Sequence, residues 1–151
     1  MTKKVFIIGG PNLGRLGQRE PDIYGDTTWA QLEALCGQWS AELGFVTEFL
    51  QTDMEGELVG MIHQASDTAE GIILNAAAYT HTSVAIRDAV AAAVIPVVEL
   101  HLTNPDAREP FRRSNLLADV VTAGIRGFGI TGYRLALEGL AQLMEDRQSP
   151  D

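Results

Sequence analysis

The sequence predicts an α/β fold built on a parallel sheet. Short apolar runs alternate along the chain with longer segments whose apolar residues recur at helical spacing. Strands that alternate with helices form parallel sheets, and the connecting helices cover both faces. We therefore expect a doubly wound sheet of five strands with helices on both faces.

The first half of the chain contains three of the expected strands and two of the helices. The strands lie at residues 5–8, 45–50 and 71–74. The first helix starts after Thr28, whose hydroxyl can cap it, and stops at Gly44. The second helix covers residues 54–69. Apolar residues at helical spacing mark both helices: Leu32, Leu35, Cys36, Trp39 and Leu43 in the first, and Leu58, Met61, Ile62 and Ala65 in the second.

The second half of the chain continues this alternation. A helix is expected at residues 82–93, followed by a strand at 96–100 that is entered through a proline, which suits a strand start. A glycine-rich fifth strand is expected near residues 125–130, and a helix at 133–144 closes the chain. Five strands connected in this way predict a flavodoxin-like fold. A length of 151 residues suits one domain spanning residues 1–151.

The composition is that of a globular protein, with 46% apolar and 21% charged residues. No apolar run approaches the roughly 20 residues that a helix needs to cross a bilayer, so we expect no membrane partner. The N-terminal residues show no signal-peptide cleavage pattern. A single cysteine, Cys36, excludes an internal disulfide and suits a reducing compartment. We therefore expect a cytoplasmic protein with Cys36 in its core.

The net charge of −9 argues against a nucleic-acid partner. Eleven acidic residues and no Lys or Arg lie between Glu20 and Ile86. Arginines gather instead in two segments, one with Arg15 and Arg19 and the other with Arg108, Arg112 and Arg113. Two interpretations stay open: chance clustering in solvated loops, or a cationic pocket for a small carboxylate.

Polar residues follow three of the expected strands directly. Asn12 comes shortly after the first strand, Asn75 after the third and His101 after the fourth. Doubly wound sheets bind ligands outside the carboxyl ends of their strands. Each residue alone could merely end a strand, but three at one edge favour a site.

The segment from Gly9 to Asp26 is longer than an ordinary connection between a strand and a helix. Long loops in compact domains often act as lids. This loop contains Arg19 and Tyr24. A tyrosine, with its reference pKa near 10, is a poor base until a cation favours its phenolate, and Arg19 could supply that cation. The alternative is a tyrosine that only packs against its neighbours.

Motifs for phosphate groups and metals fail on inspection. Residues 9–14 have the glycine spacing of a P-loop, but Arg15 and Leu16 stand where Lys and Ser or Thr are required. The first strand is not followed by a dinucleotide fingerprint, and the three histidines lack the spacing of metal ligands. We therefore expect neither a metal nor a cofactor.

The chain resembles the type II 3-dehydroquinate dehydratases over nearly its whole length. The resemblance rests on matching segments in one order: residues 10–13, 16–17, 19–25, 55–58, 78–83, 87–88, 98–104, 107–109, 111–112, 127, 129 and 132–133. It implies a flavodoxin-like fold and dehydration of 3-dehydroquinate to 3-dehydroshikimate, a step of the shikimate or quinate pathway, through an enolate and without a cofactor. It also implies a homo-oligomer built from trimers, with a dodecamer as the family's usual assembly.

The resemblance further implies roles for individual residues. Tyr24 would remove a proton, Arg19 would favour its phenolate, and Asn12 would hold a water against the enolate. His101, oriented by Glu99, would protonate the departing hydroxyl. The substrate would be held by Asn75, His81, Arg108, Arg112 and the backbone amides of Leu102 and Thr103. Asp88 would reach the site of a neighbouring subunit.

The chain departs from the family pattern around these residues. The departures are Gly9, Gly14, Arg15, Asp53, Met54, Ala76, Ala77, Asp106 and the segment 113–115. Ala76 and Ala77 stand where the family commonly has Pro and Gly. The departures concern the rate and substrate preference more than the type of reaction. Two other functions remain open: a related lyase acting on another cyclic hydroxy acid, and a non-catalytic flavodoxin-like binding module.

Overall fold

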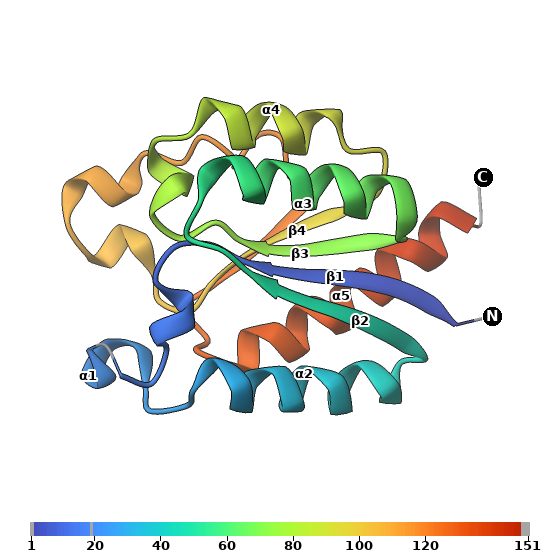
Figure 1. Ribbon diagram of the computed structural model, residues 1–151, viewed down its shortest axis with the longest axis horizontal. Helices are drawn as coiled ribbons and strands as arrows, with labels where there is room; N and C mark the ends of the chain where they lie inside the picture. Colours follow the sequence, from blue (N-terminus) through green and yellow to red (C-terminus); the bar gives the residue numbers. More distant parts are fainter. Residues whose placement is uncertain (1, 19, 149–151) are drawn as a thin grey trace.

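Five parallel strands form one sheet in the order β2-β1-β3-β4-β5 in the computed structural model, which describes residues 2–18 and 20–148 (Figure 1). The strands are β1 (Lys3–Gly9), β2 (Phe45–Gln51), β3 (Gly71–Asn75), β4 (Val97–His101) and β5 (Ala123–Arg126). This is the strand order of the flavodoxin-like fold, so the predicted fold class is confirmed.

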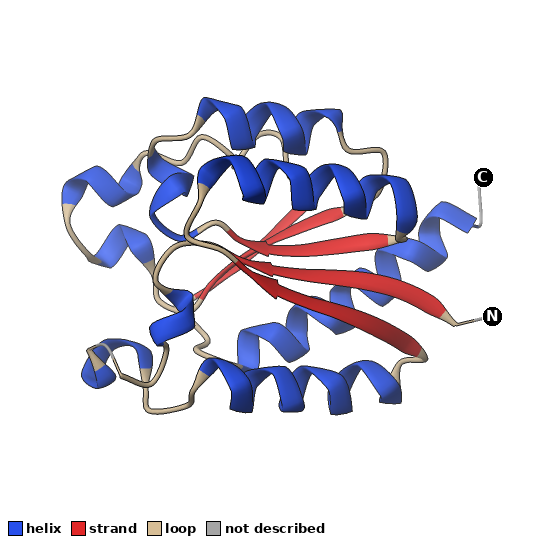
Figure 2. Cartoon of the chain, viewed as in Figure 1, coloured by secondary structure: helices blue, strands red, loops and turns tan. Residues whose placement is uncertain are grey.

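Helices lie on both faces of this sheet (Figure 2). On one face pack α2 (Trp29–Glu42) and α5 (Thr131–Gln148), and on the other α3 (Glu55–Thr68) and α4 (Val84–Ala92). Short helical turns occupy the loops: η1 (Leu13–Arg15), α1 (Pro21–Tyr24), η2 (Ala77–His81), η3 (Pro105–Ala107) and η4 (Pro110–Arg113). The four long helices therefore build the layers, while the short ones lie at the carboxyl ends of the strands.

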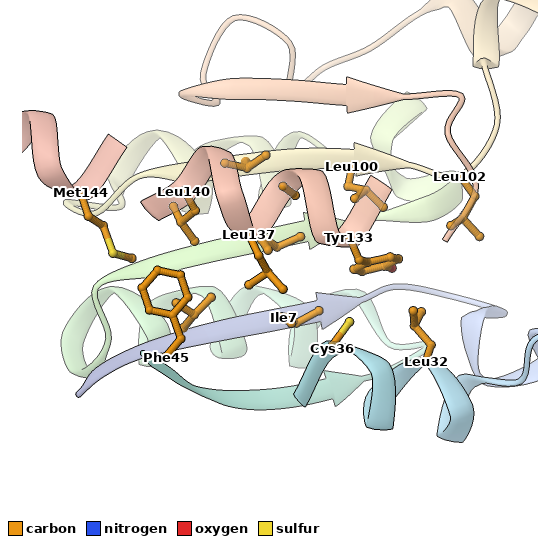
Figure 3. Packing of buried hydrophobic residues seen from close by; sticks show 14 of the residues in the cluster. Ile7, Leu32, Cys36, Phe45, Leu100, Leu102, Tyr133, Leu137, Leu140 and Met144 are labelled. Atoms are coloured by element: carbon orange, nitrogen blue, oxygen red, sulfur yellow. The ribbon is translucent and has the colours of Figure 1, made fainter. Parts of the chain in front are cut away.

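Each face of the sheet has its own core, because successive residues of a strand point to opposite faces. Figure 3 shows the core under α2 and α5, where Ile7 of β1 belongs to the same cluster as Cys36 and Leu137. Cys36 is fully buried, as expected, and burial raises the pKa of its thiol to about 12. The thiol is therefore a neutral core group and not a nucleophile.

The predicted start of α2 is confirmed. The Thr28 side chain accepts a hydrogen bond from the backbone N–H of Gln31 at 3.1 Å, and the Gln31 side chain accepts one from the N–H of Thr28 at 2.9 Å. This reciprocal pair satisfies two donors that the helix itself leaves without partners.

The fifth strand is shorter and begins earlier than the expected segment 125–130. Gly127 and Gly129 have φ values of 92° and 60°, in the left-handed region that ends a strand and that glycine adopts readily. The chain then turns into α5. The glycines that suggested a strand therefore form its exit.

The connection from β4 to β5 contains the turns η3 and η4 where a doubly wound fold usually has a full helix. One face of β5 is consequently open, and Ala123, Gly124 and Arg126 are exposed. A hollow of about 440 Å³ lies there. Within the described part of the chain, no helix has the length and apolar character needed to span a membrane.

Removal of the Thr28 cap should destabilise the fold without touching the loops at the strand ends. We expect Thr28→Ala to lower the free energy of unfolding by about 1 kcal/mol, measured by urea denaturation. Thr68→Ala is the matched control, because the Thr68 hydroxyl only donates to the carbonyl of Gln64 in its own helix, at 2.7 Å. An equal loss in both variants would contradict the capping role.

Candidate active site

The carboxyl ends of β1, β3 and β4 meet at one pocket, among the loops at the left of Figure 1. Nine of the predicted site residues line this pocket: Asn12, Tyr24, Asn75, His81, His101, Leu102, Thr103, Arg108 and Arg112. They come from segments that are far apart in the sequence. The fold therefore brings together most of the residues that the sequence proposed for one site.

Two of the predicted residues that the structure describes, Glu99 and Asp88, do not line the pocket. Glu99 lies behind His101, on the side of the second hollow. Asp88 is exposed on α4 and faces no part of the pocket of its own chain. Arg19 lies outside the described residues.

Asn12 is held by a carboxylate that the sequence marked only as a departure from the family pattern. Its backbone N–H donates to Asp53 Oδ1 at 2.9 Å, and the Gln51 side chain donates to the same oxygen at 3.0 Å. These donors, with Arg15 nearby, keep the pKa of Asp53 below its usual value. Asn12 has a φ of 71°, a left-handed conformation that asparagine tolerates better than most residues. Asp53 therefore stabilises an unusual turn at the edge of the pocket.

Asn75 ends β3 and is almost fully buried. Its side-chain oxygen accepts a hydrogen bond from the N–H of Ala77 at 3.0 Å. The side chain also interacts with the buried Tyr133 hydroxyl, so part of its NH₂ group is left to donate to a ligand. Ala77 has a φ of 52° and lines the pocket. A left-handed alanine costs on the order of 1 kcal/mol, and its Cβ narrows a wall where the family pattern has glycine.

His101 ends β4 and is backed by a carboxylate. Its Nε2 lies 3.1 Å from Glu99 Oε2, and both side chains are largely buried. The two atoms are close enough to form an ion pair when the imidazole is protonated, but the contact does not have the geometry of a hydrogen bond. Because Nε2 faces Glu99, the other ring nitrogen, Nδ1, is the one left to contact a ligand in the pocket.

Tyr24 is contacted by Arg108, which the sequence assigned to the substrate. Arg108 donates to the Tyr24 hydroxyl at 2.8 Å, and its guanidinium lies 5.4 Å from the centre of the ring. We predicted Arg108 as a substrate ligand and Arg19 as the cation beside Tyr24. The contact with Arg108 is a second one beside the expected contact with Arg19, which lies outside the described residues and stays a prediction. No spacing pattern joins two residues that are 84 positions apart, which is why the sequence missed this contact.

Two further side chains of the pocket are held by neighbours. Arg112 donates to Glu109 Oε1 at 2.9 Å, which lowers the pKa of the Glu109 carboxyl to about 2 and raises the pKa of Arg112. His81 Nδ1 lies 2.7 Å from the carbonyl oxygen of Ser114, so Nδ1 carries the proton and Nε2 remains for a ligand.

The pocket combines groups for proton transfer with donors for an anion. Tyr24 beside a guanidinium can act as a base, and an imidazole backed by a carboxylate can act as an acid. Arg112, Asn75 and His81 can hold a carboxylate or hydroxyl groups. Among residues 2–18 and 20–148, no group of three or more His, Cys, Asp or Glu side chains is arranged to bind a metal ion.

Comparison with known proteins shows the family to which the chain belongs. Residues 3–141 match the family model described as "Dehydroquinase class II". The chain belongs to this family. A relative named 3-dehydroquinate dehydratase from Jannaschia sp. (strain CCS1) is 49% identical over 97% of this chain and 99% of its own length. Another, 3-dehydroquinate dehydratase 2 from Pseudomonas aeruginosa, is 48% identical over 96% of this chain and 98% of its own length.

Solved structures of class II dehydroquinases have the same fold. The type II dehydroquinase from Propionibacterium acnes superposes with a TM-score of 0.90 at 45% identity, covering 94% of this chain and 98% of that one. The enzyme from Butyrivibrio crossotus also gives 0.90, at 35% identity, covering 92% and 97%. The resemblance inferred from the sequence is therefore confirmed at the level of family and fold.

The ion pair that holds Arg112 in this dehydroquinase gives a prediction about pH. Since the pKa of Glu109 is lowered on folding, its stabilising interaction is complete above the unfolded value, about 4.3, and is lost as the pH falls toward 2. Arg112→Gln should return the pKa of Glu109 toward 4.5, measured by carboxyl NMR titration. Arg113→Gln, the neighbouring control, should leave it near 2; a pKa unmoved by Arg112→Gln would contradict the pairing.

Proposed function

We propose that this chain dehydrates 3-dehydroquinate to 3-dehydroshikimate, with Tyr24 as the base and His101 as the acid. Family membership and the names of the relatives support the reaction. The observation that carries the residue assignment is the contact of Arg108 with the Tyr24 hydroxyl, in a pocket that His101 also lines. A phenol next to a guanidinium is the strongest candidate base in this pocket.

The first step is removal of a proton from the carbon beside the ketone. The Tyr24 phenolate takes the proton, and the electron pair of the broken C–H bond moves toward the ketone oxygen to form an enolate. Asn12, in the turn stabilised by Asp53, stabilises the enolate through a bound water. Arg108 stabilises the phenolate before the step.

The second step is loss of the hydroxyl group. The enolate electrons form the carbon–carbon double bond, the ketone is restored, and the C–O bond breaks. His101 gives its proton to the departing oxygen, which leaves as water. The Glu99 carboxylate, 3.1 Å from Nε2, stabilises the protonated imidazole before the transfer. Return of the proton from Tyr24 to His101 completes the cycle.

Substrate binding uses the donors around these two groups. Arg112 is held by Glu109, and Asn75 and His81 each have one end fixed by a backbone partner. The remaining donors of Arg112 and Asn75, with the backbone amides of Leu102 and Thr103, suit the carboxylate of the substrate, and Nε2 of His81 can accept a hydrogen bond from a substrate hydroxyl. Such donors also explain why an acidic protein can bind an anion.

The shape of the pocket supports a second candidate function, dehydration of a related cyclic hydroxy acid. Ala77 narrows the site where the family pattern has glycine, which would suit a related cyclic hydroxy acid of different shape. A comparison of kcat/KM for 3-dehydroquinate between the wild type and Ala77→Gly separates the two reactions. A large gain in the variant would favour the second candidate.

We further propose that the enzyme works as a homo-oligomer built from trimers, as in a dodecamer. The outer side of α4 is unusually apolar for a helix in water: Val84, Ala85, Ala91 and Ala92 are all exposed around the carboxylate of Asp88. The hollow beside β5 is lined by Arg112, Arg113 and Arg126, and it adjoins the pocket through His81 and His101. A carboxylate of a neighbouring subunit would meet cations there.

We also propose that the chain acts as one catalytic domain in the cytoplasm. All five strands belong to one sheet, and Asn12, Tyr24 and His101 line one pocket at the carboxyl ends of its strands. The single cysteine is buried, which suits a compartment in which disulfides are not needed.

Tyr24→Phe tests the base. The assay follows the ultraviolet absorbance of the enone product, and turnover should fall at least about 100-fold while binding changes only a few-fold, since the ring is kept. Tyr79→Phe is the matched control: it removes the same hydroxyl from a tyrosine that does not line the pocket, and it should keep most of the activity. Retention of turnover by Tyr24→Phe would exclude this residue as the base.

Asp88→Asn tests the shared site. We expect it to loosen the assembly or to raise KM, without lowering the free energy of unfolding of the subunit, because the side chain is exposed within its own chain. Light scattering gives the assembly size, and the enone assay gives KM. Asp67→Asn, on the exposed surface of α3, is the control. A monomer with full activity would overturn the proposed assembly.

A further inference from the structure

Asn115, in the segment between η4 and β5, holds the carboxylate of Glu99. Its side-chain nitrogen donates to both oxygens of Glu99, at 3.1 Å and 3.0 Å. Its side-chain oxygen accepts a hydrogen bond from the N–H of Leu117 at 2.8 Å. Since one end of the amide is occupied by the backbone, the NH₂ end has a fixed direction toward Glu99.

Glu99 therefore lies between two side chains. Oε2 is 3.0 Å from the nitrogen of Asn115 and 3.1 Å from Nε2 of His101. A buried carboxylate needs hydrogen-bond donors, and a neutral amide supplies them without adding a charge. A lysine or arginine at this place would compete with His101 for the carboxylate. An asparagine orients Glu99 and leaves its charge available to the imidazole.

We propose that Asn115 is a positioning residue for His101, acting through Glu99. With the carboxylate fixed, Nε2 of the ring stays against Glu99 and Nδ1 is directed to the substrate. A carboxylate that orients an imidazole in this way also selects its tautomer. This inference rests on the proposed role of His101 as the acid.

In the sequence, residue 115 stood out only as one of the residues that differ from the family pattern. Its role could not be predicted there, because it depends on the open face of β5. The absence of a full helix between β4 and β5 lets the chain cross beside Glu99. The same absence leaves Asn115 and Glu99 lining the second hollow, on the side of His101 away from the substrate pocket.

A purely structural role for Asn115 is separable from this one, since the two roles use opposite ends of the amide. Asn115→Asp keeps an oxygen for the N–H of Leu117 and nearly the same shape. It replaces the donor that faces Glu99 by a second carboxylate oxygen. Two carboxylates at this distance repel, and protonation of one of them restores a donor.

We expect Asn115→Asp to lower kcat for 3-dehydroquinate about 10- to 100-fold near neutral pH, with KM within about threefold of the wild type. The deficit relative to the wild type should shrink as the pH falls, because the protonated carboxyl can donate to its partner. Asn115→Ala is the second variant: it is small and uncharged and has no donor for Glu99, so kcat should fall without electrostatic repulsion and should not recover at low pH.

Asn104→Asp is the matched control. The Asn104 side chain also accepts a backbone hydrogen bond, from Asp106 at 3.2 Å, but it has no contact with Glu99. It should keep the wild-type kcat at all pH values. Wild-type kcat in both Asn115 variants, or an equal loss in Asn104→Asp, would overturn the inference.

His101→Ala, assayed in parallel, separates this inference from the proposed function. A large loss in His101→Ala together with normal Asn115 variants would overturn only the role of Asn115. Full activity in His101→Ala would overturn the acid itself and, with it, the positioning role. A loss in His101→Ala and in both Asn115 variants, with recovery at low pH in Asn115→Asp alone, supports both.

Discussion

All five strands run in the same direction, and this arrangement places every carboxyl end along one edge of the sheet. The central strands are buried along almost their whole length, so a polar side chain inside them needs a partner, as Glu99 has in Asn115, and the other polar residues of β3 and β4 stand where the strands leave the core. Asn75 and His101 are the last residues of β3 and β4. The topology therefore collects the polar chemistry of distant segments in one pocket, and the loops between strand and helix complete it.

Three polar side chains of that pocket are each held in place by a hydrogen-bond partner from the protein. A first partner occupies one end of each group: the N–H of Ala77 for Asn75, the carbonyl of Ser114 for His81, and Glu109 for Arg112. The remaining polar atoms of these side chains are available to a ligand in the pocket that they line. Such fixation before binding reduces the entropy that a ligand must remove when it binds.

The edge of the sheet also concentrates strain and charge. Asn12 and Ala77 both have left-handed backbone conformations, at a cost on the order of 1 kcal/mol for a residue such as alanine, and both line the pocket. The protein as a whole has a net charge of −9, yet Arg108 and Arg112 face the same pocket. The acidic residues elsewhere on the protein do not weaken the contacts of these arginines with a bound anion much, because such contacts are short and partly buried.

The amino-acid sequence by itself determined the first four strands, most helix boundaries and the edge of the sheet that holds the site. These features depend on local rules, such as the cap at Thr28 and the apolar runs that end at Asn75 and His101. Only the tertiary structure decided that Arg108 contacts Tyr24 and that Asn115 holds Glu99, as these pairs lie 84 and 16 residues apart. It also decided that the glycines after residue 126 leave the fifth strand. The physical reason is the same in each case: loops have no periodicity, so the position of their side chains follows from packing and turns that the whole fold sets.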